Sequence, residues 1–154
     1  MTPIPYAAGA LALRPEADAD RDFLLGLFRA ARPPEWALFP QGPMLEQLMQ
    51  MQFAAQRAGH KAQYPQAQGE VVLLDGVPVG RVLVDRQHLV DIALLPAHRS
   101  RGIGTAILRA MMREASAITL GVAVGNEAAL RLYRRLGFAV TAASPTDVAM
   151  RWTA

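Results

Sequence analysis

Residues 94–105 of this chain read Leu94-Leu95-Pro96-Ala97-His98-Arg99-Ser100-Arg101-Gly102-Ile103-Gly104-Thr105. An apolar, strand-like run stops at Pro96, and apolar residues at helical spacing begin at Ile103. Consecutive backbone N–H groups at a helix start bind anions, glycines let the main chain approach closely, and arginines add positive charge. The segment therefore predicts a strand-to-helix junction suited to a phosphate or pyrophosphate, while the residues alone leave an ordinary turn open.

Upstream of this junction the pattern predicts an antiparallel meander. Residues 71–74 and 77–84 flank Asp75-Gly76, a two-residue turn typical of a β-hairpin. The run from Leu89 to Leu95 is apolar on both faces except at Asp91, which indicates a strand in the centre of a sheet.

Downstream, the spacing predicts an amphipathic helix from Ile103, a buried strand over residues 118–124 and a second helix over 127–136. Gly137 is expected to end that helix, and a last pair of strands falls within residues 138–152.

The first seventy residues predict a strand, a helix, a loop and a further helix. The strand covers residues 11–15, and Asp18 or Asp20 is expected to cap the following helix, which breaks at residues 32–36. The further helix begins near Pro43, and one of its faces would carry Met44, Leu48, Met51 and Ala55.

Composition and element order favour a single domain over residues 1–154. At 154 residues and 52% hydrophobic content, the chain is long and apolar enough to bury a core. The predicted order gives an α/β (α+β) fold, with a mixed, mostly antiparallel central sheet and helices on both faces.

Charge and cysteine content limit the classes of ligand and site that we expect. The formal net charge of +3 suits an anionic ligand, but the basic residues are scattered, so we expect no nucleic-acid partner. The absence of cysteine excludes disulfides and thiolate metal sites, and His60, His88 and His98 are isolated, so no metal is expected. No apolar run reaches the length of a bilayer span, and we expect a soluble, unprocessed, cytoplasmic protein without a membrane partner.

Two ordered motifs resemble the Gcn5-related N-acetyltransferase (GNAT) family. Residues 94–104 are similar to its acetyl-CoA signature, Arg/Gln-x-x-Gly-x-Gly/Ala after a buried strand. Its later strand, Asn-x-x-Ala helix and Tyr-x-x-x-Gly-Phe ending match a second block that contains Leu120 to Val124, Asn126, Ala129, Leu130, Tyr133, Leu136, Gly137 and Phe138. The resemblance implies the acyl-CoA N-acyltransferase fold, with residues 71–154 as the acetyl-CoA-binding core and residues 8–70 as the variable acceptor-side strand and helices.

The resemblance also implies a set of cofactor-binding residues. Main-chain groups of Ile92, Ala93 and Leu94 would bind the pantetheine arm, which would enter a gap between two diverging strands. Asn126 and Tyr133 would lie on the pantetheine side. The pyrophosphate would be held by the loop and helix start, namely Arg99, Ser100, Arg101, Gly102, Ile103, Gly104 and Thr105.

Tyr133 is implied as the general acid that protonates the leaving thiolate. A phenol with a pKa of about 10 suits that role better than a carboxylic acid, although Tyr133 also belongs to an apolar helical stripe and could simply pack. The general base stays open between Asp91 and His88, because each could equally be structural and a water-relayed path would need neither.

Other residues have structural alternatives. Asn126 could cap a helix, and Arg131, Arg134 and Arg135 are interpreted as solvated helix positions. The acceptor pocket should draw on the first helices and their loop, with the candidates Trp36, Phe39, Gln41, Met51, Gln52, Phe53, Gln56 and Tyr64.

Together these features predict an N-acetyltransferase that moves an acetyl group directly from acetyl-CoA to a primary amine of a small molecule or peptide. A non-catalytic acyl-CoA-binding or sensing domain would use the same junction without turnover and is the alternative. The family resemblance is also compatible with a homodimer formed through the last strands.

Overall fold

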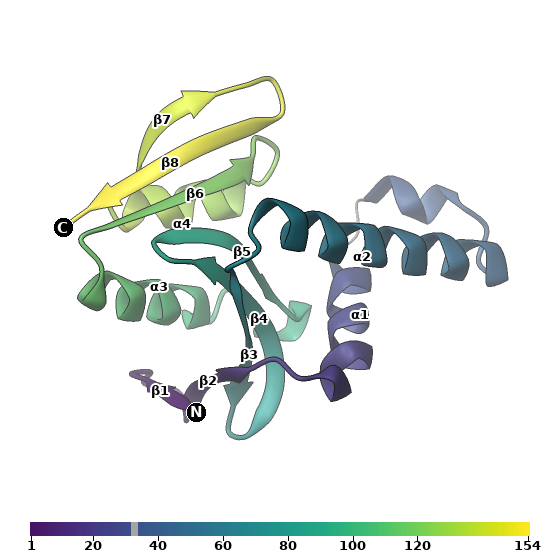
Figure 1. Cartoon of the computed structure of the whole chain (residues 1–154), viewed down its shortest axis with the longest axis horizontal. Coiled ribbons are helices and arrows are strands. Elements are labelled where there is room, and N and C mark those ends of the chain that lie inside the picture. The colour runs from purple at the N-terminus through teal and green to yellow at the C-terminus, as the bar shows by residue number, and fades with distance from the viewer. Residues whose placement is uncertain (32–33) are drawn as a thin grey trace.

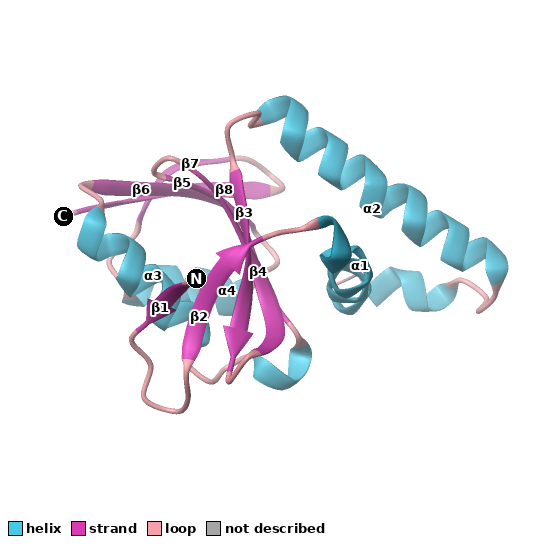
Figure 2. Ribbon diagram, turned by 60° about the horizontal axis from the view of Figure 1, so that its bottom comes forward, coloured by secondary structure: helices cyan, strands magenta, loops and turns pink. Residues whose placement is uncertain are grey.

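One sheet of eight strands organises the computed structural model, which describes residues 1–31 and 34–154. The strand order is β1-β2-β3-β4-β5-β6-β8-β7, and every described pairing is antiparallel except that of β5 with β6. Helices α1 and α2 lie on one side of this sheet and α3 and α4 on the other (Figures 1 and 2). The predicted fold class, a mixed and mostly antiparallel sheet with helices on both faces, is confirmed.

The N-terminal part supplies the first two strands, of which β1 is an edge of the sheet, and the two helices of one face. These elements are β1 (Thr2–Ile4), β2 (Leu11–Pro15), the short 3-10 helix η1 (Asp18–Asp20), α1 (Arg21–Ala30), the 3-10 helix η2 (Pro34–Leu38) and α2 (Pro43–Gln63). Strand β1 was not predicted, because Pro3 and Pro5 weaken its strand signal. A proline is tolerated there because β1 is the outermost strand.

The middle of the chain forms the predicted meander of β3 (Gln68–Leu74), β4 (Val77–Asp85) and β5 (His88–Leu94). In the turn between β3 and β4, Asp75 has φ 51° and Gly76 has φ 80°. Two positive φ values in succession suit the right-handed twist of a two-residue hairpin, which explains why the Asp-Gly pair predicted it correctly.

The C-terminal part contains η3 (Pro96–His98), α3 (Ile103–Glu114), β6 (Ala117–Ala123), α4 (Glu127–Arg135), β7 (Ala139–Ala143) and β8 (Asp147–Thr153). Gly137 ends α4 as predicted, with φ 98°. The N–H of Phe138 donates to the carbonyl of Tyr133 at 3.0 Å, and the N–H of Gly137 donates to that of Arg134 at 3.0 Å. These two bonds close the helix end in a Schellman motif, which needs a left-handed residue at position 137.

The two faces of the sheet are packed unequally. The main core lies between the sheet and α3 and α4, where Ile103, Ile107, Leu108 and Ile118 are fully buried. The opposite face carries a smaller cluster of Leu24, Leu25 and Phe53 from α1 and α2. No helix within the described part of the chain combines the length and apolarity needed to cross a bilayer.

The second helix presents a different face from the predicted one. Leu45, Met49 and Phe53 are its buried residues, whereas Met44 is 87% exposed and Met51 is 63% exposed. Both sets have helical spacing, so periodicity detected the helix but selected the wrong stripe. Hydrophobic burial favours the stripe that includes the larger aromatic ring, Phe53.

Two further predictions concern the start and the end of α1. Asp20 occupies the N-cap position, but its carboxylate makes no bond to the helix N–H groups and instead accepts from the N–H of Ala17 and from the guanidinium of Arg14, each at 2.8 Å. The predicted break at residues 32–36 begins at residues 32 and 33, which lie outside the described residues.

Candidate active site

Strands β5 and β6 separate soon after they pair. Their parallel pairing consists of His88 with Thr119 and Leu89 with Leu120. Beyond this point a hollow opens between them, here called the strand gap. It is lined by residues 89–92 and 120–123 and by Asn126, Ala129 and Tyr133. The divergence leaves the main chain of residues 92–94 without a strand partner on the β6 side.

A β-bulge in β5 sets the direction of Asp91. The register with β4 changes between the pairs Leu83–Asp91 and Val84–Leu89, which leaves Val90 as an extra residue. Without the bulge, Leu89 and Asp91 would point to the same face of the sheet. With it, Leu89 is buried in the main core while Asp91 reaches the face covered by α1 and α2.

The glycine-rich segment forms the predicted helix start. Gly102 is the N-cap of α3 and has φ 81°, a left-handed conformation that other residues adopt at a cost. The first bond of the helix runs from the N–H of Ala106 to the carbonyl of Gly102 at 3.0 Å. The N–H groups of residues 103–105 therefore lack a partner within the helix and are available to an anion.

A second hollow, here called the cradle, lies at this helix start. It is lined by Leu94, Arg99, Ser100, Gly102, Ile103, Gly104 and Thr105, and on the α4 side by Ala128, Ala129, Arg131, Leu132 and Arg135. A Cβ added at Gly104 would be in van der Waals contact with Leu132 Cδ2 at 3.6 Å, so this glycine lies close to α4. Six of the seven residues predicted for the pyrophosphate therefore line one hollow.

Arginines from two elements face the cradle. Arg99 is anchored by its Nε, which donates to the carbonyl of Leu94 at 3.0 Å. Arg131 and Arg135 line the cradle from α4, one turn apart, and both are solvent-exposed, as the sequence interpretation expected. Arg101 does not line the cradle, and its carbonyl accepts a hydrogen bond from the hydroxyl of Tyr6 at 2.7 Å.

Tyr133 projects from α4 into the strand gap. The residue is only 6% exposed, and its ring lies 5.6 Å from that of Phe138. Burial, followed by the nearby Asp91 carboxylate, raises the pKa of Tyr133 to about 12. The phenol therefore keeps its proton at neutral pH and can act as a hydrogen donor in the gap. The same shift moves its pKa further from that of a thiol than an unperturbed tyrosine would be.

Asn126 caps α4 and also lies beside the strand gap. Its side-chain oxygen accepts the N–H of Ala129 at 3.2 Å and so caps α4. The residue also lines the strand gap. The helix cap therefore places an amide at the border of the gap.

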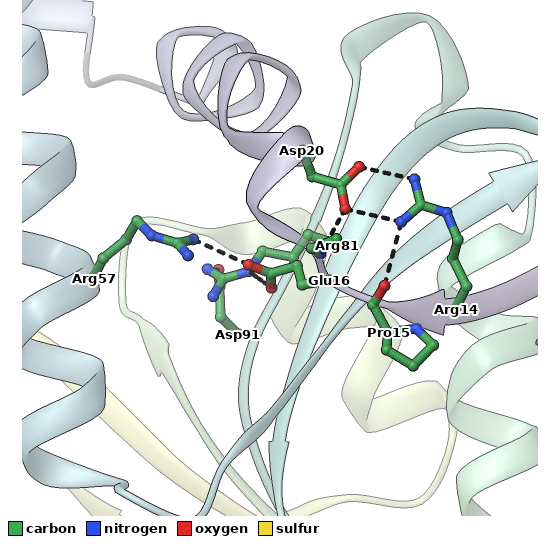
Figure 3. Close-up of polar contacts among 8 residues, drawn as sticks. Arg14, Pro15, Glu16, Asp20, Arg57, Arg81 and Asp91 are labelled. Atoms are coloured by element: carbon green, nitrogen blue, oxygen red, sulfur yellow. Dashed lines mark hydrogen bonds and ion pairs between the residues drawn. The ribbon is translucent and has the colours of Figure 1, made fainter.

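Asp91 belongs to a polar network that joins three elements on the α1 and α2 face (Figure 3). Glu16 accepts from Arg81 Nε at 3.0 Å and from Arg57 Nη1 at 3.1 Å, and Arg81 Nη1 lies 3.6 Å from Asp91 Oδ2. Burial raises the pKa of Asp91 above its ordinary value, against the lowering effects of Arg81, His60 and the N–H of Ile92. A carboxylate with a raised pKa is a better proton acceptor than a solvated one.

The other base candidate, His88, is held away from the strand gap. Its Nδ1 lies 2.8 Å from Thr119 Oγ1, and its Nε2 lies 3.3 Å from the hydroxyl of Tyr64. The Tyr64 ring stacks on the imidazole at 5.3 Å. Both ring nitrogens therefore have structural partners, and His88 does not line the gap, whereas Asp91 does.

A third hollow, here called the apolar slot, lies between α1, α2 and the sheet. Its lining residues are Leu24, Leu27, Phe28, Ala31, Phe53, Gln56, Arg81, Asp91 and Ala93. Of the acceptor candidates from the sequence, Phe53 and Gln56 line the slot. Tyr64 lies against His88, and Phe39, Gln41, Met51 and Gln52 are exposed outside the slot.

The three hollows adjoin in series. Ala129 lines both the cradle and the strand gap, and Asp91 lines both the strand gap and the apolar slot. The series runs from unpaired N–H groups and arginines, past a free strand edge, to a carboxylate. The unpaired N–H groups and arginines suit the phosphates of acetyl-CoA, and the free strand edge suits its amide-containing arm, so the residues present fit that molecule.

The sequence interpretation missed Glu16 and Arg81, and it did not place the exposed α4 arginines beside the cradle. Arg131 and Arg135 could have been found from their helical spacing on the stripe of Ala128 and Leu132. Glu16 and Arg81 lie 65 positions apart in the sequence, and no local pattern signals their pairing.

Comparison with known proteins identifies the family. The model of the Acetyltransferase (GNAT) family matches residues 29–138. An N-alpha-acetyltransferase of Sulfurisphaera tokodaii is 44% identical over 62 residues, which are 36% of this chain and 37% of the relative. The peptidyl-lysine N-acetyltransferase YjaB of Escherichia coli is 33% identical over 70 residues, 46% of this chain and 48% of the relative. The chain thus covers less than half of either relative.

A solved structure extends the likeness of fold to nearly the whole chain. The PaiA N-acetyltransferase of Thermoplasma acidophilum, crystallised with coenzyme A, superposes with a TM-score of 0.68 at 15% identity, over 94% of this chain and 99% of that one. The family match covers more than half of the chain and includes the cradle, the strand gap and Tyr133. The protein belongs to the GNAT acetyltransferase family.

Proposed function

We propose that this protein is an N-acetyltransferase that transfers an acetyl group directly from acetyl-CoA to a primary amine. The observation that carries the proposal is the series of three adjoining hollows, with an anion-binding helix start at one end and Asp91 at the other. Such an order would hold the two reactants on opposite sides of the sheet, with their reactive groups meeting at the strand gap.

The cosubstrate would be held mainly by backbone groups. The N–H groups of residues 103–105, with Arg99, Arg131 and Arg135, would bind its phosphates. The edge of β5 at residues 92–94, which has no strand partner on the β6 side, would bind the amides of its arm as an added strand does. Acetyl-CoA supplies the acetyl group as a thioester, which an amine can cleave when it is held in place and unprotonated.

Two side chains would handle protons on opposite faces of the sheet. Asp91 projects to the α1 and α2 face and would accept the proton that the amine loses as its nitrogen bonds to the acetyl carbon. Tyr133 projects from α4 and would donate a proton to the sulfur as the carbon–sulfur bond breaks. Its raised pKa makes Asp91 a stronger base than a solvated aspartate. With a pKa of about 12, Tyr133 stays protonated at neutral pH and has a proton to donate.

Calorimetric titration with acetyl-CoA tests the cosubstrate site with a matched pair of variants. Gly102→Glu puts a negative charge at the start of α3 beside the cradle, and we expect binding to weaken at least ~100-fold. Gly76→Glu is the control, because Gly76 has nearly the same φ, 80° against 81°, but lies in the remote β3–β4 turn. The control variant should bind as the wild type does, and absence of binding by the wild-type protein would refute the proposal.

Turnover separates the enzyme from a domain that only binds acyl-CoA. Thiol release with a panel of amines should be measurable for the wild type and reduced ~100-fold or more in kcat for Tyr133→Phe. The substitution removes only the hydroxyl, so packing on Phe138 and acetyl-CoA affinity should persist. Binding without release of thiol for any amine would favour the sensing alternative.

Two further expectations belong to this proposal. A homodimer would use the last strands, where β7 pairs with β8 and all five residues of β7 are exposed. Sedimentation analysis would detect such a dimer.

A cytoplasmic location agrees with the absence of cysteine and would be checked by cell fractionation.

A further inference from the structure

The apolar slot is the hollow into which an acceptor would extend beyond Asp91. Its walls are the side chains of Leu24, Leu27 and Phe28 from α1 and of Phe53 from α2. Its volume is about 80 Å³, roughly half of the ~150 Å³ cavity that accepts a benzene ring, so the slot has room for about three or four non-hydrogen atoms. That is the size of a small branched aliphatic group.

The charged groups at the slot are already largely paired. Arg81 is 8% exposed, its Nε donates to Glu16 at 3.0 Å, and its Nη1 lies 3.6 Å from Asp91. Its guanidinium is therefore neutralised by two carboxylates and is not free to bind a carboxylate of the acceptor. Gln56 adds one neutral amide at an exposed position on α2.

Asp91 is the polar group best placed to meet an amine. Its side chain is 32% exposed and lines both the slot and the strand gap. An amine nitrogen at this carboxylate would therefore lie at the border of the gap, with its carbon skeleton in the slot. A second ammonium in the slot would lie among apolar walls and beside Arg81, which disfavours polyamines.

We infer that the acceptor is a primary amine whose nitrogen-bearing carbon skeleton is apolar and about the size of a leucine side chain. This inference rests on the proposed function and specifies its substrate class. The chemistry is shared by free alkyl amines and by peptides that begin with an apolar residue, and the experiment includes both.

The test compares kcat/KM with acetyl-CoA across matched amines. Isoamylamine and phenethylamine represent free apolar amines, a leucine-initiated tripeptide represents the peptide source, and ethanolamine, putrescine and a glycine-initiated tripeptide are the polar or small counterparts. We expect at least a tenfold preference for the apolar member of the class that is used, because each buried methylene favours binding.

A pair of variants links that preference to the slot. Leu27→Ala enlarges the slot and should shift the ratio of kcat/KM for phenethylamine over isoamylamine, or for phenylalanine-initiated over leucine-initiated peptides, by about tenfold toward the larger group. Leu25→Ala removes the same atoms from the same helix, but Leu25 does not line the slot, so this control should leave the ratio unchanged. Thermal melts compare the stability of the two variants, and the wild-type panel decides the inference if either variant does not fold.

The outcomes separate this inference from the function on which it rests. Turnover that is equal or better with ethanolamine, putrescine or the glycine-initiated peptide would overturn the slot assignment while the acetyltransferase proposal stands. An equal shift in both variants would also overturn it. No turnover with any amine would count against the proposed function itself.

Discussion

The two faces of the sheet differ in how their functional groups are specified. On the α3 and α4 side, half of the residues that line the cradle come from one short segment, Arg99 to Thr105, which also supplies the unpaired backbone N–H groups. On the α1 and α2 side, Asp91 is held by Arg81, which is in turn held by Glu16, and each comes from a different element. A ligand site built from one segment can be recognised locally, whereas a site built from three separate segments of the chain requires the fold.

Asp91 lies where the two sides meet, and its replacement should have the largest effect on activity. We expect Asp91→Asn to lower kcat/KM by ~10²–10⁴, the usual contribution of a general base, while acetyl-CoA affinity stays within about twofold. Asp85→Asn is a suitable control, because it removes a carboxylate from β4 outside the strand gap and the slot. Similar losses in both variants would show that Asp91 has no special role.

The pH profile of the same pair gives an independent measurement. The base must be unprotonated to act, and the pKa of Asp91 is raised, chiefly by burial. Activity should therefore fall as the pH decreases through a value above the ordinary aspartate pKa of about 3.9. This acidic limb should disappear from the residual activity of Asp91→Asn and persist in Asp85→Asn.

Because α2 buries the stripe that contains Met49 and exposes the one that contains Met51, we expect substitutions at these two methionines to differ greatly in their effect on stability. Met49 is buried beneath the helix, and Met49→Ala should lower the free energy of unfolding by ~2–5 kcal/mol. Met51 lies on the exposed stripe, and Met51→Ala should change it by no more than ~0.5 kcal/mol. Urea denaturation of both variants measures the difference, and a larger loss for Met51→Ala would restore the stripe expected from the sequence.

A smaller effect is expected where the acceptor side depends on a glycine. A Cβ at Gly69 would lie 2.1 Å from Glu16 Oε2, so Gly69→Ala must displace the carboxylate that holds Arg81. We expect a loss of ~1–3 kcal/mol in stability and a raised KM for the amine, with acetyl-CoA affinity unchanged.

Gly59→Ala in α2 is the control for that experiment, because an added Cβ there meets nothing within 4 Å. It should leave activity unchanged and stabilise the helix by up to ~1 kcal/mol. Denaturation and steady-state kinetics on the two variants would separate displacement of Glu16 from the general effect of replacing a glycine. A similar KM in both variants would argue against a link between Glu16 and the acceptor.

Features set by a few neighbouring residues could be predicted from the sequence, whereas features set by packing between distant segments could not. Asp75-Gly76, Pro96, Gly102 and Gly137 each favour or terminate one local conformation, so the meander, the helix start and the end of α4 were all predicted. The strand Thr2–Ile4 was missed because edge strands tolerate prolines that weaken the signal. The helix at residues 43–63 was found, but its buried face depends on what covers it.

The sequence by itself determined the class of fold and the position of the cradle, because φ preferences, strand alternation and helical periodicity act over a few residues. Only the tertiary structure decided where Asp91 points, since a bulge at Val90 arises from pairing with β4 and turns one side chain to the other face of the sheet. It also decided that His88 is bonded to Tyr64 and Thr119 and that Glu16 meets Arg81. These contacts join residues that lie far apart along the chain, and their favourable energy exists only after the sheet has brought them together.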